Sequence, residues 1–100
     1  VYKLKKGEYM SASIALLCLQ ATEDGRSIAE AIKEDNEGVV ITNKPAMIQI
    51  ERAERITVKA STVSEKLGRD WDPEELQLVL ISLGGQVDET DDEFVVYWNN

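Results

Sequence analysis

The 100 residues are enough for one domain with a single hydrophobic core, because 43% of them are apolar and a chain of this size buries about two-thirds of its unfolded surface. The net charge of −8 and a pI near 4.5 disfavour nucleic acid and anionic membranes as partners. Histidine is absent and Cys18 is the sole cysteine, which excludes Cys–His and Ser–His catalysis, histidine-bearing metal sites and an intrachain disulfide.

The first nine residues differ in charge from the rest of the chain. They hold three of the 11 basic residues and only one of the 19 acidic ones. Met10 is followed by Ser-Ala-Ser, as at a translational start. We therefore expect residues 1–9 to be an expression remnant or a flexible N-terminal extension, and residues 10–100 to form a single domain.

The first predicted element is a strand over residues 13–20. The run is apolar almost throughout, so we expect a strand that is buried on both faces and central in its sheet. Cys18 lies within this run. We interpret it as a buried, unreactive thiol, which fits a reducing, cytoplasmic setting.

A helix is predicted over residues 26–35, with Asp24 or Ser27 as its N-terminal cap. Its apolar residues recur at the spacing of one helix face: Ile28, Ala31 and Ile32. The opposite face is polar. It is either an ordinary solvated face or a surface for a partner.

Three short strands are predicted next, over residues 39–42, 46–52 and 55–59. Pro45 belongs to the turn between the first two, since proline cannot donate a hydrogen bond to a strand ladder. Apolar and polar residues alternate in the last two strands. Each of these strands therefore has one face toward the core and one toward water or a partner.

Two helical segments follow the strands. A second helix is predicted from Ser61 to its stop at Gly68, with capping-box character in its first turn. Asp72 and Pro73 are typical of a helix start and predict one further short turn of helix. Trp71 lies between the two, beside a charged crossover. Core packing is the preferred interpretation for both tryptophans, and we expect Trp71 to be more exposed than Trp98.

The last quarter of the chain, from residue 76 to residue 98, is predicted to be a hairpin. One apolar strand ends near Gly84 and Gly85, and a return strand rich in β-branched and aromatic residues covers 94–98. Residues 88–93 contain five acids in six positions, which we interpret as a solvated turn. A Ca²⁺ site there is disfavoured, because the turn lacks the glycine and the final glutamate of a calcium-binding loop.

The predicted fold is α/β (α+β), with antiparallel sheets in two small layers and two main helices, in the order β-α-β-β-β-α-(short α)-β-β. No pattern favours catalysis. Acid pairs such as Glu74 and Glu75 lie in hydrophilic turns, whereas acid–base catalysis needs a desolvated pair in a cleft. The residues taken alone thus indicate a cofactorless binding domain.

Four segments carry a resemblance to a known family: AEAIKEDN at 29–36, PAMIQIE at 45–51, TVSEKLGRDWDPEEL at 62–76 and ISLGGQVDETDDEFVVYW at 81–98. Together they resemble the small regulatory (effector or coupling) proteins of bacterial soluble diiron monooxygenases, most closely those of multicomponent phenol hydroxylases. The resemblance implies a non-catalytic component without metal or cofactor. Such a component binds the oligomeric diiron hydroxylase and promotes oxygen activation and the coupled, NADH-dependent hydroxylation of phenols to catechols. It also implies a reductase that competes for, or shares, the docking surface.

We expect the hydroxylase to contact the outer face and exit of the first helix, with polar strand positions as a second choice. The candidate contacts are Arg26, Ser27, Glu30, Lys33, Glu34 and Asn36 on the helix and Met47, Gln49 and Thr57 on the strands. The alternative is a free-standing acidic adaptor that binds a protein and has no link to a monooxygenase. Neither nucleic acid nor a membrane is an expected partner.

Overall fold

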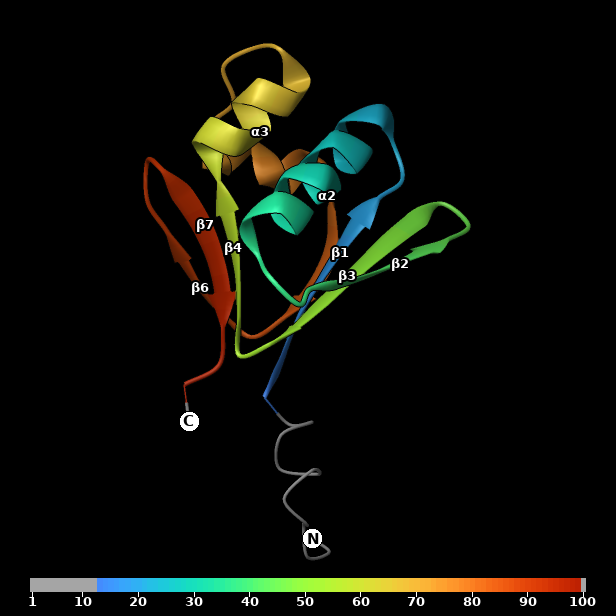
Figure 1. Ribbon diagram of the computed structural model, residues 1–100, viewed down its shortest axis with the longest axis vertical. Coiled ribbons are helices and arrows are strands. Elements are labelled where there is room, and N and C mark those ends of the chain that lie inside the picture. The colour runs from blue at the N-terminus through green and yellow to red at the C-terminus, as the bar shows by residue number, and fades with distance from the viewer. Residues whose placement is uncertain (1–12, 100) are drawn as a thin grey trace, which may run out of the picture.

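A computed structural model describes residues 13–99 and shows two antiparallel sheets with helices packed against them (Figure 1). The elements are β1 (Ile14–Gln20), α2 (Glu23–Asp35), β2 (Val40–Lys44), β3 (Met47–Ala53), β4 (Arg55–Lys59), α3 (Ala60–Leu67), the 3-10 helix η1 (Pro73–Leu78), β5 (Leu80–Gly84), β6 (Gln86–Glu89) and β7 (Glu93–Tyr97). The predicted α+β class with two main helices is confirmed. The predictions for residues 1–9 and for a start at Met10 lie outside the described residues.

Sheet A contains four strands in the order β2-β3-β1-β5, so β1 is central, as its apolar run predicts. Leu17 pairs with Ile50 on one side and with Leu83 on the other, and Leu17 and Ile50 are fully buried. The other face of β1 is less completely covered. Cys18 is buried there, as expected, but Leu16 is only half-buried.

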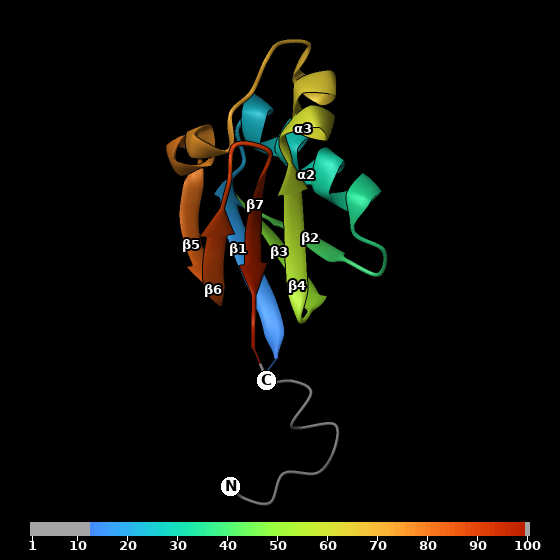
Figure 2. The same ribbon diagram turned by 90° about the vertical axis from the view of Figure 1, so that its left-hand side faces the viewer.

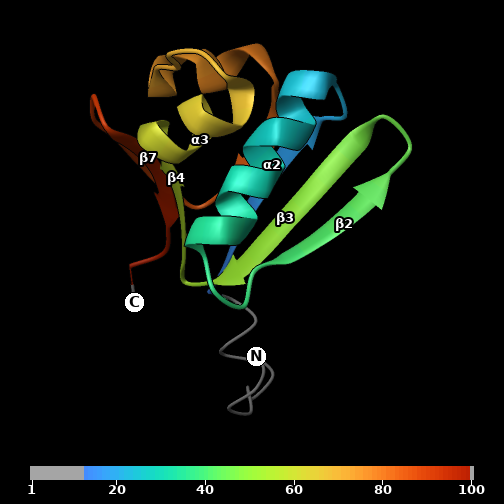
Figure 3. The ribbon, with the colours of Figure 1, turned by 45° about the horizontal axis from the view of Figure 1, so that its top comes forward.

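Sheet B contains three strands in the order β4-β7-β6, and it lies in front of sheet A in Figure 2. Its inner face is apolar: Ile56 pairs with Val96 and Val58 with Phe94, and all four are buried. Figure 3 shows α2 running along β3 on one side and beside β4 on the other. The core therefore lies between the two sheets and α2.

The last quarter of the chain forms three strands, not the two that were predicted. Residues up to Leu78 belong to η1, and β5 pairs with β1 in sheet A, whereas β6 pairs with β7 in sheet B. The chain changes sheets at Gly85, whose φ is 138° and where a Cβ would lie 2.9 Å from the Cγ1 atom of Val96. The predicted bend is correct, but the hairpin is β6–β7 alone.

Helix α2 begins three residues before the predicted start, and neither predicted residue caps it. The hydroxyl of Thr22 accepts a hydrogen bond from the Gly25 N–H at 3.0 Å, which satisfies one of the free amides of the first turn. Glu23 and Asp24 instead occupy the first turn, where the helix dipole favours acids.

The capping box predicted for α3 is absent from that helix and present at η1. No side chain caps α3; the Ala60 N–H donates to the carbonyl of Asp92 at 2.8 Å instead. At η1, Asp72 accepts from the Glu74 N–H, and the Glu75 carboxylate accepts from the Asp72 N–H, each at 3.1 Å. The predicted short helix at Asp72-Pro73 is confirmed.

The relative exposure of the two tryptophans is the reverse of the prediction. Trp71 is 5% exposed, because the crossover folds over the core. The backbone N–H of Trp71 donates to the Ser64 hydroxyl at 2.9 Å and holds the crossover there. Trp98 is 39% exposed, and its indole Nε1–H donates to the Ile14 carbonyl at 2.8 Å.

Candidate docking surface

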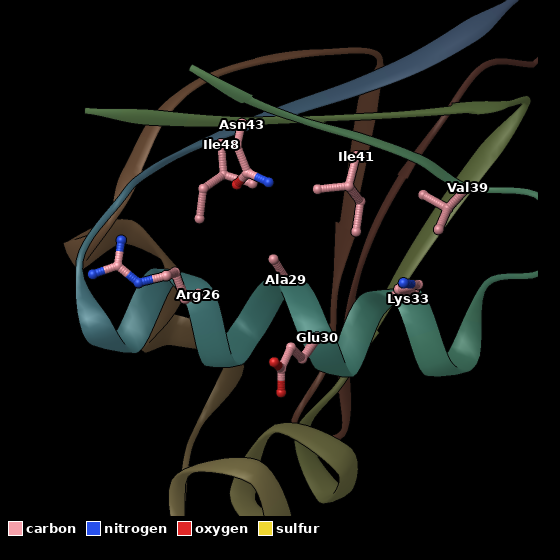
Figure 4. A pocket seen from close by; sticks show the side chains of 8 residues that line it. All are labelled: Arg26, Ala29, Glu30, Lys33, Val39, Ile41, Asn43 and Ile48. Carbon is pink, nitrogen blue, oxygen red and sulfur yellow. The ribbon is translucent and has the colours of Figure 1, made fainter. Parts of the chain in front are cut away.

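A groove of about 430 Å³ lies between α2 and strand β2 (Figure 4). It exists because β2 is the edge strand of sheet A and continues beyond the strip of sheet that α2 covers. Its lining comes from Arg26, Ala29, Glu30 and Lys33 on α2 and from Val39, Ile41, Asn43 and Ile48 on the opposite wall. Three of the predicted contact residues are thus brought together here.

The groove has an apolar floor and a charged rim. Ala29, Ile41 and Ile48 face one another across its base in Figure 4. Arg26 is fixed at one end by a 2.9 Å hydrogen bond from its Nη1 to the Ala21 carbonyl, and Lys33 is exposed at the other end. Apolar contact area surrounded by polar groups is the usual anatomy of a protein–protein interface.

The other side of α2 faces helix α3. Glu34 pairs with Lys66 at 2.7 Å, and Ser27, two turns before Glu34, is half-buried on the same side. The hydrogen bond and the charge of the Glu34 carboxylate raise the pKa of Lys66 above its ordinary range. The Lys66 ammonium is therefore charged at neutral pH, and its attraction to Glu34 is lost as the pH rises through that raised pKa. Ser27 and Glu34 do not reach the groove.

Asn36 is 1% exposed, which removes it from the exposed helix face on which it was predicted. Its Nδ2 group donates to the carbonyls of Ile32 and Thr57, and its Oδ1 accepts from the Thr57 N–H, all at 2.8 Å. The side-chain amide therefore occupies the edge of β4 not paired with β7, as a residue of a further strand would. Asn36 attaches the end of α2 to sheet B.

The strand positions of the prediction lie apart from the groove. Met47 and Gln49 alternate with buried Ile48 and therefore belong to the face of β3 turned away from α2. Thr57 is on sheet B, beside Asn36. The groove wall on β2 was missed, although the alternation of Val39, Ile41 and Asn43 could have placed them on one face.

Within residues 13–99, no group of three or more histidine, cysteine, aspartate or glutamate side chains is arranged to hold a metal ion. The acids of residues 88–92 are exposed, as predicted, but the turn is shorter than the predicted 88–93, because Asp88 and Glu89 belong to β6 and Glu93 is half-buried at the start of β7. None of the helices in the described part is long and apolar enough to cross a membrane.

Comparison with known proteins identifies the family. The MmoB/DmpM family matches residues 13–97. The stimulatory component DmpM of phenol 2-monooxygenase from Pseudomonas sp. (strain CF600) is 42% identical over 89 residues, which are 89% of this chain and 99% of that protein. A solved structure of a phenol hydroxylase–regulatory protein complex contains a chain that is 42% identical, with a TM-score of 0.82, over 86% of this chain and 99% of that one. The soluble methane monooxygenase regulatory protein B shares the fold at 18% identity, with a TM-score of 0.70 over 86% of this chain and 65% of that one. The chain therefore belongs to the MmoB/DmpM family.

Proposed function

We propose that this chain is the cofactorless regulatory component of a bacterial multicomponent phenol monooxygenase. It binds the hydroxylase component and stimulates the hydroxylation of phenols to catechols. The observation that carries this proposal is the 42% identity to a phenol 2-monooxygenase stimulatory component along 99% of its length. The similarity to a chain from a phenol hydroxylase–regulatory protein complex supports the same partner.

The mechanism is a shift in the conformational equilibrium of the hydroxylase. A bound protein changes such an equilibrium only by as much as it binds one state better than the other. Stimulation by about tenfold through this route requires about 1.4 kcal/mol of preferential binding to the active state. A component with no redox group can therefore control oxygen activation at the diiron centre of its partner.

The proposal extends to the rest of the system. Electrons come from NADH through a reductase that competes for the docking surface or shares it. The oligomeric hydroxylase and this component work in the cytoplasm. Exchange with the reductase favours moderate affinity, so a standard-sized interface with few anchor residues is expected.

We place the main hydroxylase contact at the groove between α2 and β2. Its support is the charged rim and the apolar lining, in which Val39 and Ile41 are partly exposed and can be buried by a partner. Lys33 has no ion-pair partner among the described residues, so its charge is free to face a partner. Arg26 completes the rim, whereas the carboxylate of Glu30 points away from the strands in Figure 4.

A titration tests the function directly. The purified protein is added in steps to a phenol hydroxylase component with reductase, NADH and phenol, and catechol is measured. The rate is expected to rise and to reach its maximum near one regulatory protein per hydroxylase active site. A flat response would remove the regulatory role and favour the free-standing acidic adaptor.

A charge reversal tests the groove. Lys33→Glu is expected to weaken hydroxylase binding by about tenfold, because it places an unmatched acid against the partner's surface. The matched control is Lys59→Glu, which makes the same charge change at the end of β4, outside the groove. Affinity is measured by calorimetry and folding by thermal denaturation. Equal affinities for the two variants would contradict docking at the groove.

A further inference from the structure

A second concave site lies at one end of the molecule, where the β3–β4 turn meets the end of β7. The recess has a volume of about 440 Å³, and its walls include Arg52, Arg55, Tyr97 and Trp98. Arginine, tyrosine and tryptophan are the residue types most enriched among the energetically dominant positions of protein interfaces. None of these four belongs to the groove between α2 and β2.

The walls of the recess are held rigid by hydrogen bonds. The Glu54 N–H donates to the Ser13 carbonyl at 2.7 Å, and the Trp98 N–H donates to the Glu54 carbonyl at 2.9 Å. Glu54 has a φ of 70°, which is uncommon for a residue other than glycine and is retained only where the surroundings enforce it. Arg52 donates from Nε to the Glu37 carbonyl and from Nη1 to the Arg55 carbonyl, each at 2.8 Å. A site so preorganised loses little entropy when it binds.

The recess is basic in a protein that is otherwise acidic. Among residues 13–99, no carboxylate forms an ion pair with Arg52 or Arg55, although Glu54 lies between them in the turn. The guanidinium of Arg55 instead lies 5.8 Å from the centre of the Tyr97 ring, and the side chain is exposed. A planar guanidinium with free donors beside an aromatic wall matches a carboxylate.

The charges of the chain argue against two candidate ligands of the recess, which are residues 1–9 and a second copy of the chain. Residues 1–9 contain three lysines and one acid, so like charge disfavours their binding to two arginines. A second copy of the chain would bring together two proteins that each carry a net charge of −8. The remaining candidate is an acidic segment of another protein, and the proposed function identifies that protein as the hydroxylase.

We propose that this recess is a second contact with the hydroxylase, and that it receives a carboxylate-bearing segment of that partner. The inference rests on the proposed function. The hydrogen bond from Arg52 to the Glu37 carbonyl connects the recess to the exit of α2, which leads directly to Val39 in the groove wall. One partner surface can therefore cover both the groove and the recess.

Charge reversal at Arg55 provides the test, with calorimetric affinity for a phenol hydroxylase component measured at two salt concentrations. Arg55→Glu is expected to weaken binding by about tenfold or more and to reduce its salt dependence, because a charged pair across the interface is lost. Arg55→Lys keeps the charge without the planar fork, so we expect a smaller loss. Lys59→Glu, at the opposite end of the same strand, is the control and should change the affinity by less than about threefold.

Several results would overturn the proposal. If the wild-type chain stimulates the hydroxylase and Arg55→Glu binds as tightly as wild type, the recess is not a contact, although the proposed function stands. Equal losses for Arg55→Glu and Lys59→Glu would indicate a general charge effect. If Arg55→Glu changes only self-association in sedimentation, the recess binds a second copy. A wild-type chain that does not bind the hydroxylase removes both proposals. Arg55→Gln, which deletes the charge alone, replaces Arg55→Glu if thermal denaturation shows that the reversal prevents folding.

Discussion

Replacing Asn36 with alanine is expected to lower the free energy of unfolding by about 3 kcal/mol. The side chain is 1% exposed and makes three hydrogen bonds of 2.8 Å, two with the backbone of Thr57 and one with the Ile32 carbonyl. Alanine would leave the Thr57 N–H and C=O groups without these partners in a part-buried position. The loss of stability is measured by urea denaturation, with the fluorescence of buried Trp71 as a probe of unfolding.

Two neighbouring variants separate the hydrogen bonds from simple loss of volume. Asn36→Asp keeps the size but places a carboxylate oxygen against the carbonyls of Ile32 and Thr57, so it should be at least as destabilising as alanine. Glu37→Ala changes an exposed side chain one residue away and should alter stability by less than about 0.5 kcal/mol. If Asn36→Ala kept full stability and lost only hydroxylase affinity, the interpretation of Asn36 as an attachment for β4 would be wrong.

Local sequence signals were sufficient for most of the elements. The alternation in residues 55–59 gave both the bounds and the inward face of β4, since a strand with one buried face repeats every two residues. Asp72 and Pro73 identified the start of η1, because cap and first-turn preferences depend only on neighbours within a turn. The apolar run of β1 likewise indicated its central place in sheet A.

The features that sequence missed depend on partners distant in the chain. In the sequence, Asn36 is one more polar residue at the end of α2, and its partner Thr57 on β4 lies 21 positions later. Glu34 is drawn to the α3 side by Lys66, 32 positions later. Trp98 meets the carbonyl of Ile14, 84 positions earlier, so neither its exposure nor the recess beside it follows from local pattern. The polar face of α2 was predicted as one surface, and the fold divides it between the groove, α3 and the interior.

Gly25→Ala should destabilise the protein by about 3 kcal/mol, although alanine in place of glycine usually favours a helix by up to about 1 kcal/mol. Gly25 is buried in the first turn of α2, and a Cβ built there would lie 2.0 Å from the Gln20 carbonyl oxygen. That carbonyl is poorly able to move. The Gln20 N–H donates to the Val79 carbonyl at 2.8 Å, and the Ala21 N–H donates to the Ala46 carbonyl at 3.2 Å.

Gly68 offers the matched control for this prediction. It ends α3 with a φ of 75°, but a Cβ there would meet nothing within 4 Å. Gly68→Ala should therefore cost only the backbone strain of a left-handed residue, about 1 kcal/mol. Urea denaturation of both variants distinguishes destabilisation by a steric clash from destabilisation by backbone strain. Equal losses of stability would show that the start of α2 can shift away from β1. Because Arg26 follows Gly25 and forms one end of the groove, a folded Gly25→Ala protein should also bind the hydroxylase less tightly, whereas Gly68→Ala should not.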